Sequence, residues 1–388
     1  MSSPSDSQLA DPRPAEPNLA DPHLADPRLA KSHLRIVAMA RAGASLTARL
    51  LDGLPGTACY PFEARFVGPP AIIDYPTAFK GGTLASALQG LGRDDVFRRV
   101  VSGKKLTKDR YFSYDAALYA KLLEEPLADN DAPALIDGVS RAFFTACEDF
   151  EPAWEEVTHI VWHDAKGIWS NLDAALRSDP KLKLLVQFRH PLEWLVRFEH
   201  MYRRRGCSID IKAALSLQAV ALANAIDLLH RWPGRVMFLR YEDVVADAGG
   251  EMRRVCAFAG IDYDEAATQP TILGQPWVSN SFLSKPQTGL FKAEKLSATT
   301  ALFDPAQVYE SNRKVFEVLG YGLEPAAVGR LEPEQATSAD ILSDQLTPIH
   351  NILHRHFMAS QKQSVTARHQ LRRWVRRAAK AGRALLNR

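Results

Sequence analysis

Cysteine is scarce in this chain, with four residues in 388. Cys59, Cys147, Cys207 and Cys256 lie far apart in the sequence and form no Cys-x-x-Cys pair. Zinc motifs and disulfide frameworks both depend on closely and regularly spaced cysteines, so the sequence predicts neither. Reduced thiols of this kind are typical of a reducing compartment, which favours the cytoplasm.

Long apolar runs and a strong net charge are also lacking. No uninterrupted apolar stretch approaches the roughly 20 residues that a membrane-spanning helix needs. Residues 1–30 hold six prolines, together with acids, where a signal peptide would have an apolar segment. The formal net charge of +3 gives no argument for nucleic acid as a partner. We expect a soluble, cytoplasmic protein with one main domain that does not bind nucleic acid.

The first residues have a repetitive composition. Residues 1–32 contain Leu-Ala-Asp-Pro three times, beginning at Leu9, Leu19 and Leu24. Proline at this frequency is incompatible with regular helix or sheet, so we predict a disordered tail. We interpret the repeat as an expanded linker, with a docking motif as the alternative.

The most informative segment follows this tail. Residues 36–40 are apolar, residues 41–45 form a turn of small residues, and residues 46–51 continue with helical spacing. A tight turn between a strand and a helix presents backbone N–H groups to an anion, and the helix N-terminus adds its positive dipole end. Arg41 and Ser45 would add a charge and a hydroxyl group. The alternative is an ordinary strand-to-helix turn, so a second site is needed to decide.

Further apolar runs alternate with amphipathic segments along the chain. The predicted strands are residues 158–162, 183–188 and 235–239, and the predicted helices are residues 133–150, 191–198, 212–231 and 251–259. A less regular region is expected from Cys59, and residues 84–130 suggest helices that line a cleft. The alternation predicts an α/β fold with a doubly wound parallel sheet flanked by helices.

A second strand, turn and helix unit begins at Arg189. Arg189-His190-Pro191 follows a predicted core strand, and open α/β sheets bind ligands at the carboxyl ends of their strands. The planar guanidinium of arginine can donate two N–H groups to one phosphate. Arg189 is therefore a candidate anion ligand, with a structural ion pair at the helix start as the alternative.

At these motifs the chain resembles the bacterial-type nucleotide-dependent sulfotransferases, which use 3′-phosphoadenosine 5′-phosphosulfate (PAPS). Residues 41–45 are similar to the family's loop for the 5′-phosphosulfate. Arg189-His190-Pro191, with Arg197 further along, is similar to its segment for the 3′-phosphate. Residues 234–243 and 273–281 resemble two further family segments. The resemblance implies a P-loop NTPase-like α/β sulfotransferase domain over residues 33–350.

This resemblance also implies a reaction and its site residues. The reaction would be sulfuryl transfer from PAPS to a hydroxyl group of a carbohydrate or other small acceptor, without a metal. The implied nucleotide contacts come from Arg41, Ala42, Gly43, Ala44, Ser45, Leu46, Arg189, Arg197, Trp277 and Asn280. Core filling is the alternative for Trp277.

A base is needed because an alcohol is a weak nucleophile until its proton is removed. The resemblance implies Glu63 or His163 for this role, with Asp164 as the alternative if the register differs by one residue. The structural alternatives are a salt bridge from Glu63 to Arg41 or Arg65, and a turn cap made by His163.

The chain departs from the family pattern at Ala42, Ala44 and Arg197, where other members usually have hydroxyl side chains. Each missing hydroxyl donor is worth about 1–3 kcal/mol to a charged ligand. An alternative function is therefore a catalytically impaired sulfotransferase-fold protein that binds a nucleotide or a partner. A P-loop kinase is disfavoured, because no Gly-Lys-Ser/Thr follows the loop.

The last residues are strongly basic. Residues 368–388 contain eight Lys and Arg residues and no acid, with apolar residues between them. We predict a basic amphipathic helix within residues 351–388. Three roles stay open: peripheral contact with the inner membrane face, binding of a polyanion, and packing on the protein's own domain.

Overall fold

The computed structural model describes residues 31–63, 115, 118, 121–122, 132–165, 168, 172–203, 209–277, 303–323, 329, 331 and 333–343. Residues 1–30 of the predicted tail 1–32, and the predicted basic helix of residues 351–388, lie outside these residues. The last residue of the predicted tail, Ser32, already begins a strand. Asn280 and nearly all of the predicted cleft region 84–130 also lie outside them.

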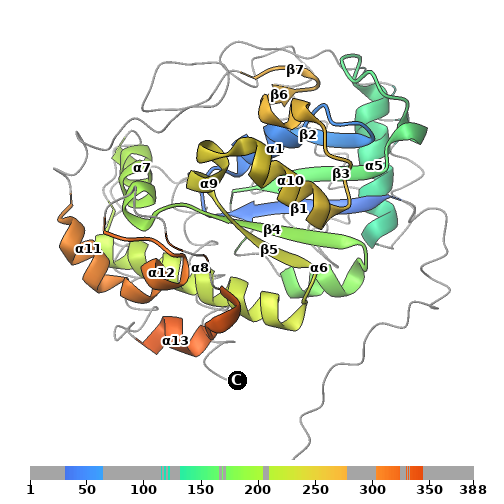
Figure 1. The fold of residues 1–388 in the computed structure, drawn as a ribbon. Helices are drawn as coiled ribbons and strands as arrows, with labels where there is room; N and C mark the ends of the chain where they lie inside the picture. Colours follow the sequence, from blue (N-terminus) through green and yellow to red (C-terminus); the bar gives the residue numbers. More distant parts are fainter. Residues whose placement is uncertain are drawn as a thin grey trace, which may run out of the picture.

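Five parallel strands form the central sheet (Figure 1). They are β1 (Ser32–Ala38), β2 (Thr57–Glu63), β3 (His159–Asp164), β4 (Leu182–Phe188) and β5 (Val236–Arg240), in the order β2-β3-β1-β4-β5. β1 pairs with β3 on one side and β4 on the other. All five carboxyl ends therefore lie at one edge, where open α/β sheets bind ligands. The predicted α/β class with a parallel sheet is confirmed.

Helices connect and surround these strands. They are α1 (Ala44–Leu51), α5 (Ala132–Ala146), α6 (Leu172–Ser178), α7 (Pro191–Arg203), α8 (Ile211–Arg231), α9 (Tyr241–Ala246), α10 (Ala248–Ala259), α11 (Pro305–Ser311), α12 (Arg313–Val318) and α13 (Ser338–Ser343). α1 packs on β1, β2 and β3, whereas α11, α12 and α13 pack on α8 (Figure 1). A short hairpin of β6 (Thr271–Ile272) and β7 (Gln275–Pro276) follows α10.

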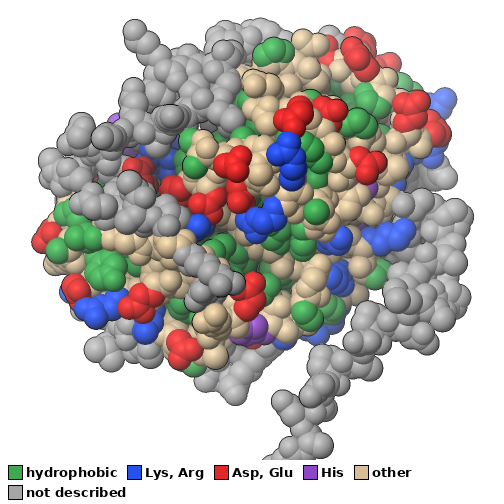
Figure 2. Space-filling model, viewed as in Figure 1, with side chains coloured by type: hydrophobic (Ala, Val, Ile, Leu, Met, Phe, Trp, Pro, Cys, Tyr) green, Lys and Arg blue, Asp and Glu red, His purple; other side chains and the backbone are tan. Residues whose placement is uncertain are grey.

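α8 is the one helix in the described ranges with the length and apolar composition of a membrane span. Most of its residues are buried against the rest of the protein. Asp210 caps its first turn by accepting a hydrogen bond from Ala213 N at 3.2 Å. α8 is therefore a core helix of the fold. On the face of the protein shown in Figure 2, acidic and basic side chains are interspersed.

Two sequence expectations about these elements are wrong. Residues 59–63, where a less regular region was expected to begin, belong to β2, and its pairing with β3 shifts in register between Cys59 and Glu63. Pro61 lies within this shift and has no N–H group for the ladder, which an edge strand tolerates. The helix expected from Glu251 begins earlier, because Asp247 caps it and accepts from Gly250 N at 2.8 Å.

The amino end of β1 contains a buried charge cluster. His33 lies between two carboxylates, with Nε2 2.7 Å from Asp137 Oδ1 and Nδ1 bonded to Asp179 Oδ2. Burial alone would lower the pKa of His33, but Asp179 and Asp137 outweigh it and raise the pKa to about 10. This cluster lies at the opposite end of β1 from the carboxyl edge.

Candidate active site

The turn between β1 and α1 has carbonyl groups that face protein donors. Ala40 O accepts a hydrogen bond from Trp194 Nε1 at 2.9 Å. Arg41 O accepts one from Arg189 Nη1 at 3.3 Å. Both donors come from the segment after β4, so the two strand–turn–helix units predicted from the sequence are brought together.

The same turn also has backbone N–H groups that can donate hydrogen bonds to a ligand. Within the described residues, the backbone N–H groups of Gly43, Ala44 and Ser45 donate to no acceptor. α1 has no side chain that caps its N-terminus. The first N–H groups of a helix need a partner from outside the helix, and an anion can provide it. The turn thus has the arrangement of an anion-binding loop.

Gly43 is required in this turn. Its φ of 106° favours glycine, and a Cβ would lie 2.3 Å from Tyr241 Cδ2 and 3.0 Å from Gln187 Nε2. The Tyr241 ring also lies against Arg189, whose Cζ is 3.8 Å from the ring centroid. Gly43, Tyr241 and Arg189 therefore join the ends of β1, β5 and β4.

Three arginines come within electrostatic range of one another here. Burial and then the charge of Arg189 lower the pKa of Arg197 to about 9, and Arg41 acts in the same direction. Arg197 is held by Glu193, one helical turn before it, through the carboxylate and through the carbonyl oxygen at 3.2 Å. A group of mutually repelling, partly buried cations attracts an anion.

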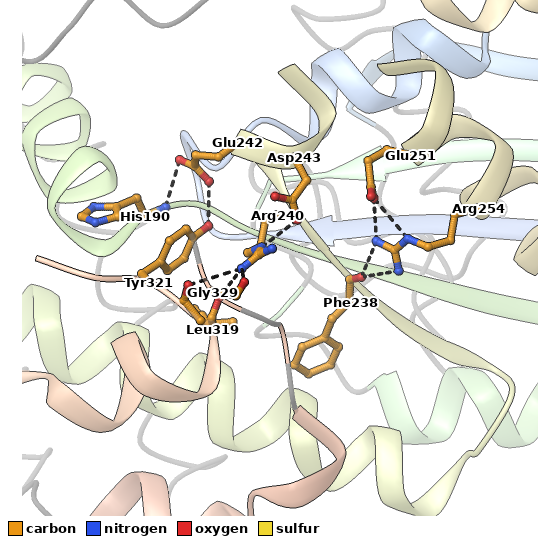
Figure 3. A network of polar contacts seen from close by, with 11 residues as sticks. His190, Phe238, Arg240, Glu242, Asp243, Glu251, Arg254, Leu319, Tyr321 and Gly329 are labelled. Atoms are coloured by element: carbon orange, nitrogen blue, oxygen red, sulfur yellow. Dashed lines mark hydrogen bonds and ion pairs between the residues drawn. The ribbon is translucent and has the colours of Figure 1, made fainter. Parts of the chain in front are cut away.

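The carboxylate of Glu242 lies close to Arg189 but accepts its hydrogen bonds from other groups. Glu242 Oε1 is 3.9 Å from Arg189 Nε. As Figure 3 shows, Glu242 accepts hydrogen bonds from His190 N at 3.1 Å and from Tyr321 Oη at 2.6 Å. Arg240 is bound by Asp243 Oδ2 at 2.7 Å and by main-chain carbonyl groups (Figure 3). Arg240 is thus a structural clamp, whereas Arg189 is only loosely paired.

Glu63 and His163 lie beside each other at the carboxyl edge, because β2 and β3 pair them. His163 is buried, and its Nε2 is 3.1 Å from Ser45 Oγ in the anion loop. Burial and then the charge of Arg49 lower the pKa of His163 to about 3, so its imidazole is neutral near pH 7. Glu63 is exposed.

Asp164 lies on the opposite face of the sheet from His163, because side chains alternate along a strand. Its Oδ2 is 3.4 Å from Arg35 Nη2, and both side chains are buried. The structure therefore places Asp164 in an ion pair inside the protein, away from Ser45 and Glu63.

The apolar residues implied as nucleotide contacts have side chains in the core. Ala42, Ala44 and Leu46 are buried, and so is Trp277, which is 6% exposed. Ala42, Ala44 and Leu46 would therefore contact an anion through their backbone only. The placement of Trp277 fits the core-filling alternative.

Sequence reasoning did not single out two residues that face the loop. Tyr241 lies in the segment 234–243, which resembles the family but assigns no role to this residue, and Gln187 is a polar residue in an apolar strand. Gln187 is 1% exposed, and its Oε1 accepts from Thr47 Oγ1 at 2.9 Å. Its Nε2 is buried and has no acceptor among the described residues. A polar side chain two positions before Arg189 was the available signal.

Comparisons with known proteins identify a family and several similar structures. A family model described as the sulfotransferase family matches residues 34–265, and no curated protein sequence matches significantly. Similar solved structures are the sulfotransferase domains of the curacin biosynthetic pathway (16% identity, TM-score 0.43, 75% of this chain and 98% of that chain) and of the Synechococcus PCC 7002 olefin synthase (16%, 0.36, 82% and 95%). The sulfotransferase from Alicyclobacillus acidocaldarius is another (15%, 0.38, 76% and 97%).

The described ranges contain no group of three His, Cys, Asp or Glu side chains placed to hold a metal ion.

The family match spans more than half of the sequence and includes all but the first two residues of β1, the strands β2 to β5, the anion loop and the arginine cluster. The chain belongs to the sulfotransferase family.

Proposed function

We propose that the protein transfers the sulfuryl group of PAPS to a hydroxyl group of a carbohydrate or other small acceptor. The observation that carries the proposal is the convergence of Arg41, Arg189 and Arg197 beside the N–H groups of residues 43–45. PAPS is anionic at both its 3′ and 5′ positions, so it matches two adjacent groups of donors. Membership of the sulfotransferase family supports the same donor.

The two ends of the nucleotide have separate ligands in this proposal. The N–H groups of residues 43–45 and the Ser45 hydroxyl hold the 5′-phosphosulfate. Arg189 and Arg197 hold the 3′-phosphate, which would offset the repulsion between these two cations. Arg189 also donates to Arg41 O, so the two halves of the site are fixed relative to each other.

The reaction needs donors where negative charge develops. The acceptor oxygen forms a bond to sulfur while the bond from sulfur to the bridging phosphate oxygen breaks. That bridging oxygen gains negative charge, and preorganised N–H and O–H donors at the loop lower the barrier. The products are a sulfate ester and adenosine 3′,5′-bisphosphate, and the acceptor proton passes to a base.

Glu63 is the base that we propose. It is exposed at the end of β2 and lies opposite His163, so an acceptor hydroxyl can reach it. His163 is buried and contacts Ser45, and its low pKa makes it a weak base. We assign His163 to positioning of Ser45 and of the loop. Asp164 has no part in the reaction, because Arg35 holds it on the other face.

A second candidate function is nucleotide binding without turnover. It is favoured by Ala42 and Ala44, which supply no hydroxyl and whose side chains are buried in the core. Both functions require the bisphosphate to bind, whereas only the first produces a sulfated acceptor.

Calorimetry tests the nucleotide site shared by both functions. The protein should bind adenosine 3′,5′-bisphosphate at least about tenfold more tightly than adenosine 5′-monophosphate, which lacks the 3′-phosphate. Arg189→Ala should remove this preference. Arg253→Ala, at an exposed ion pair with Glu265, is the matched control and should retain it. Equal affinities for the two nucleotides in the unmodified protein would overturn the assignment.

A further inference from the structure

One face of α1 contacts His163 and the strand that carries Glu63. Ser45 and Arg49 are four residues apart on this helix, so their side chains lie on the same face. Ser45 Oγ contacts His163 Nε2 on β3 at 3.1 Å. Arg49, one turn later, reaches the carboxyl half of β2.

Arg49 is bound to the irregular part of β2. Its Nη1 donates to Tyr60 O at 3.1 Å and its Nη2 to Pro61 O at 2.6 Å. These carbonyl groups lie within the register shift between Cys59 and Glu63, where Pro61 cannot donate to β3. After the shift, Glu63 pairs with His163 again. The guanidinium therefore anchors the strand where its own ladder is interrupted.

The charge of Arg49 is deeply buried. Its side chain has no salt bridge to a carboxylate within the described residues, and burial lowers its pKa. The carboxylate of Asp52, one turn later, accepts instead from Thr271 Oγ1 at 2.7 Å and from Gly274 N at 2.9 Å. A buried cation is costly where carbonyl groups alone hold it, so a role besides packing is expected of it.

We propose that Arg49 is a positioning residue for the sulfuryl-transfer reaction: it fixes the end of β2 so that Glu63 lies beside His163 and the anion loop. The proposal rests on the proposed function, because it takes Glu63 as the base. It makes α1 a link between the two halves of the reaction centre. The start of the helix binds the anion, and its last turn holds the strand that carries the base.

Electrostatics support the same role. The Arg49 charge is the second cause, after burial, of the low pKa of His163. Arg49 therefore helps to keep the imidazole beside Ser45 uncharged. With its proton on Nε2, the neutral imidazole can donate to Ser45 Oγ, which leaves the Ser45 O–H for the 5′-phosphosulfate.

Arg49→Met and Arg49→Lys are the variants that test this role. Methionine removes the charge and both donors, while lysine keeps the charge on a single ammonium group. Arg235→Met is the matched control, because Arg235 also binds carbonyl groups, those of Leu176 at 2.9 Å and Leu182 at 3.1 Å. These carbonyls lie near the amino end of β4, away from the site.

Hydrogen exchange at the amides of Tyr60 and Glu63 reports the anchoring of β2 without any need for catalysis. Arg49→Met should speed this exchange about tenfold or more relative to Arg235→Met. It should also lower kcat about 10- to 100-fold, because a small displacement of a catalytic group has an effect of this size. The dissociation constant of adenosine 3′,5′-bisphosphate should change by less than about threefold, and Arg49→Lys should be intermediate in exchange and kcat.

Two results overturn the proposal: exchange in Arg49→Met equal to that in the control, or faster exchange with an unchanged kcat. If Arg49→Met does not fold, Arg49→Lys is judged by the same two readouts. If the unmodified protein transfers no sulfuryl group, the proposed function fails, and the exchange comparison alone decides whether Arg49 anchors β2.

Discussion

The Arg189 guanidinium donates to the carbonyl oxygen of Arg41 at 3.3 Å, so the turn after β4 is joined directly to the turn after β1. The same guanidinium lies over the Tyr241 ring, which lies against Gly43. Three strand ends are thereby locked into one anion-binding arrangement. A change at any of these residues should affect nucleotide binding more than its own contacts suggest.

Gly43→Ala should weaken nucleotide binding and destabilise the fold. The substitution combines a φ of 106° with a Cβ 2.3 Å from Tyr241, so a loss of about 1–3 kcal/mol is expected. Gly234→Ala is the matched control, since Gly234 also has a positive φ of 74° but no atom within 4 Å of the added Cβ. Thermal unfolding and calorimetry with adenosine 3′,5′-bisphosphate should show a larger loss for Gly43→Ala. Equal losses in the two variants would contradict the close packing of Tyr241 against Gly43.

Arg197→Ser, which restores the residue type usual in the family, should weaken nucleotide binding about tenfold through loss of a charge-assisted hydrogen bond. Arg203→Ser is the control, because Arg203 forms a similar ion pair with Glu199 on α7 while its side chain is 59% exposed. Calorimetry at two salt concentrations should show a smaller salt dependence for Arg197→Ser alone. Tighter binding in this variant would mean that Arg197 obstructs the 3′-phosphate.

Glu63→Gln should lower kcat about 10²- to 10⁴-fold with little change in nucleotide affinity, because glutamine cannot accept the acceptor's proton. His163→Gln should change nucleotide affinity as well, since His163 contacts Ser45 in the anion loop. Steady-state kinetics and calorimetry on the two variants separate these roles. Full activity in Glu63→Gln would remove Glu63 as the base.

Stability should fall at alkaline pH because of His33. Its pKa is raised from 6.5 in the unfolded chain to about 10 in the folded protein, so its contribution is fully present below pH 6.5. Between these values the folded state keeps a proton that the unfolded state has lost. The free energy of unfolding should therefore decrease with rising pH, by up to about 1.4 kcal/mol per pH unit.

Urea unfolding between pH 6 and 10 measures this slope. His33→Gln should flatten it, whereas His230→Gln, at an exposed position on α8, should leave it unchanged. A slope that persists in His33→Gln would assign the effect to other groups.

The sequence predicted the parts of the fold that have strong local patterns. The apolar runs of β3, β4 and β5 and the spacing of α7 and α8 are local signals, and the structure confirms these elements. β2 was missed, because Pro61 is uncommon in strands and the surrounding ladder shifts in register. The early start of α10 was hidden by Gly249 and Gly250, which are poor helix formers.

The site was less accessible to sequence reasoning, because its contacts join distant segments. That Asp164 pairs with Arg35 while His163 meets Ser45 depends on which face of β3 each side chain occupies, and the register of the sheet decides this. Tyr241 lies beside Gly43 and Arg189 only because β5 pairs with β4. Site residues that belong to a recognisable motif could be identified from the sequence. Gln187 and Arg49 could not, because their roles depend on contacts that only the folded structure shows.

Transfer of radiolabelled sulfate from PAPS tests the central claim most directly. The full chain would be incubated with labelled PAPS and a cell extract as the source of acceptors, beside Arg189→Ala and Glu63→Gln. We predict that label passes to an acceptor with the unmodified protein and that both variants lose most of this transfer. Tight binding of adenosine 3′,5′-bisphosphate without any labelled acceptor would contradict the enzyme assignment and favour nucleotide binding without turnover.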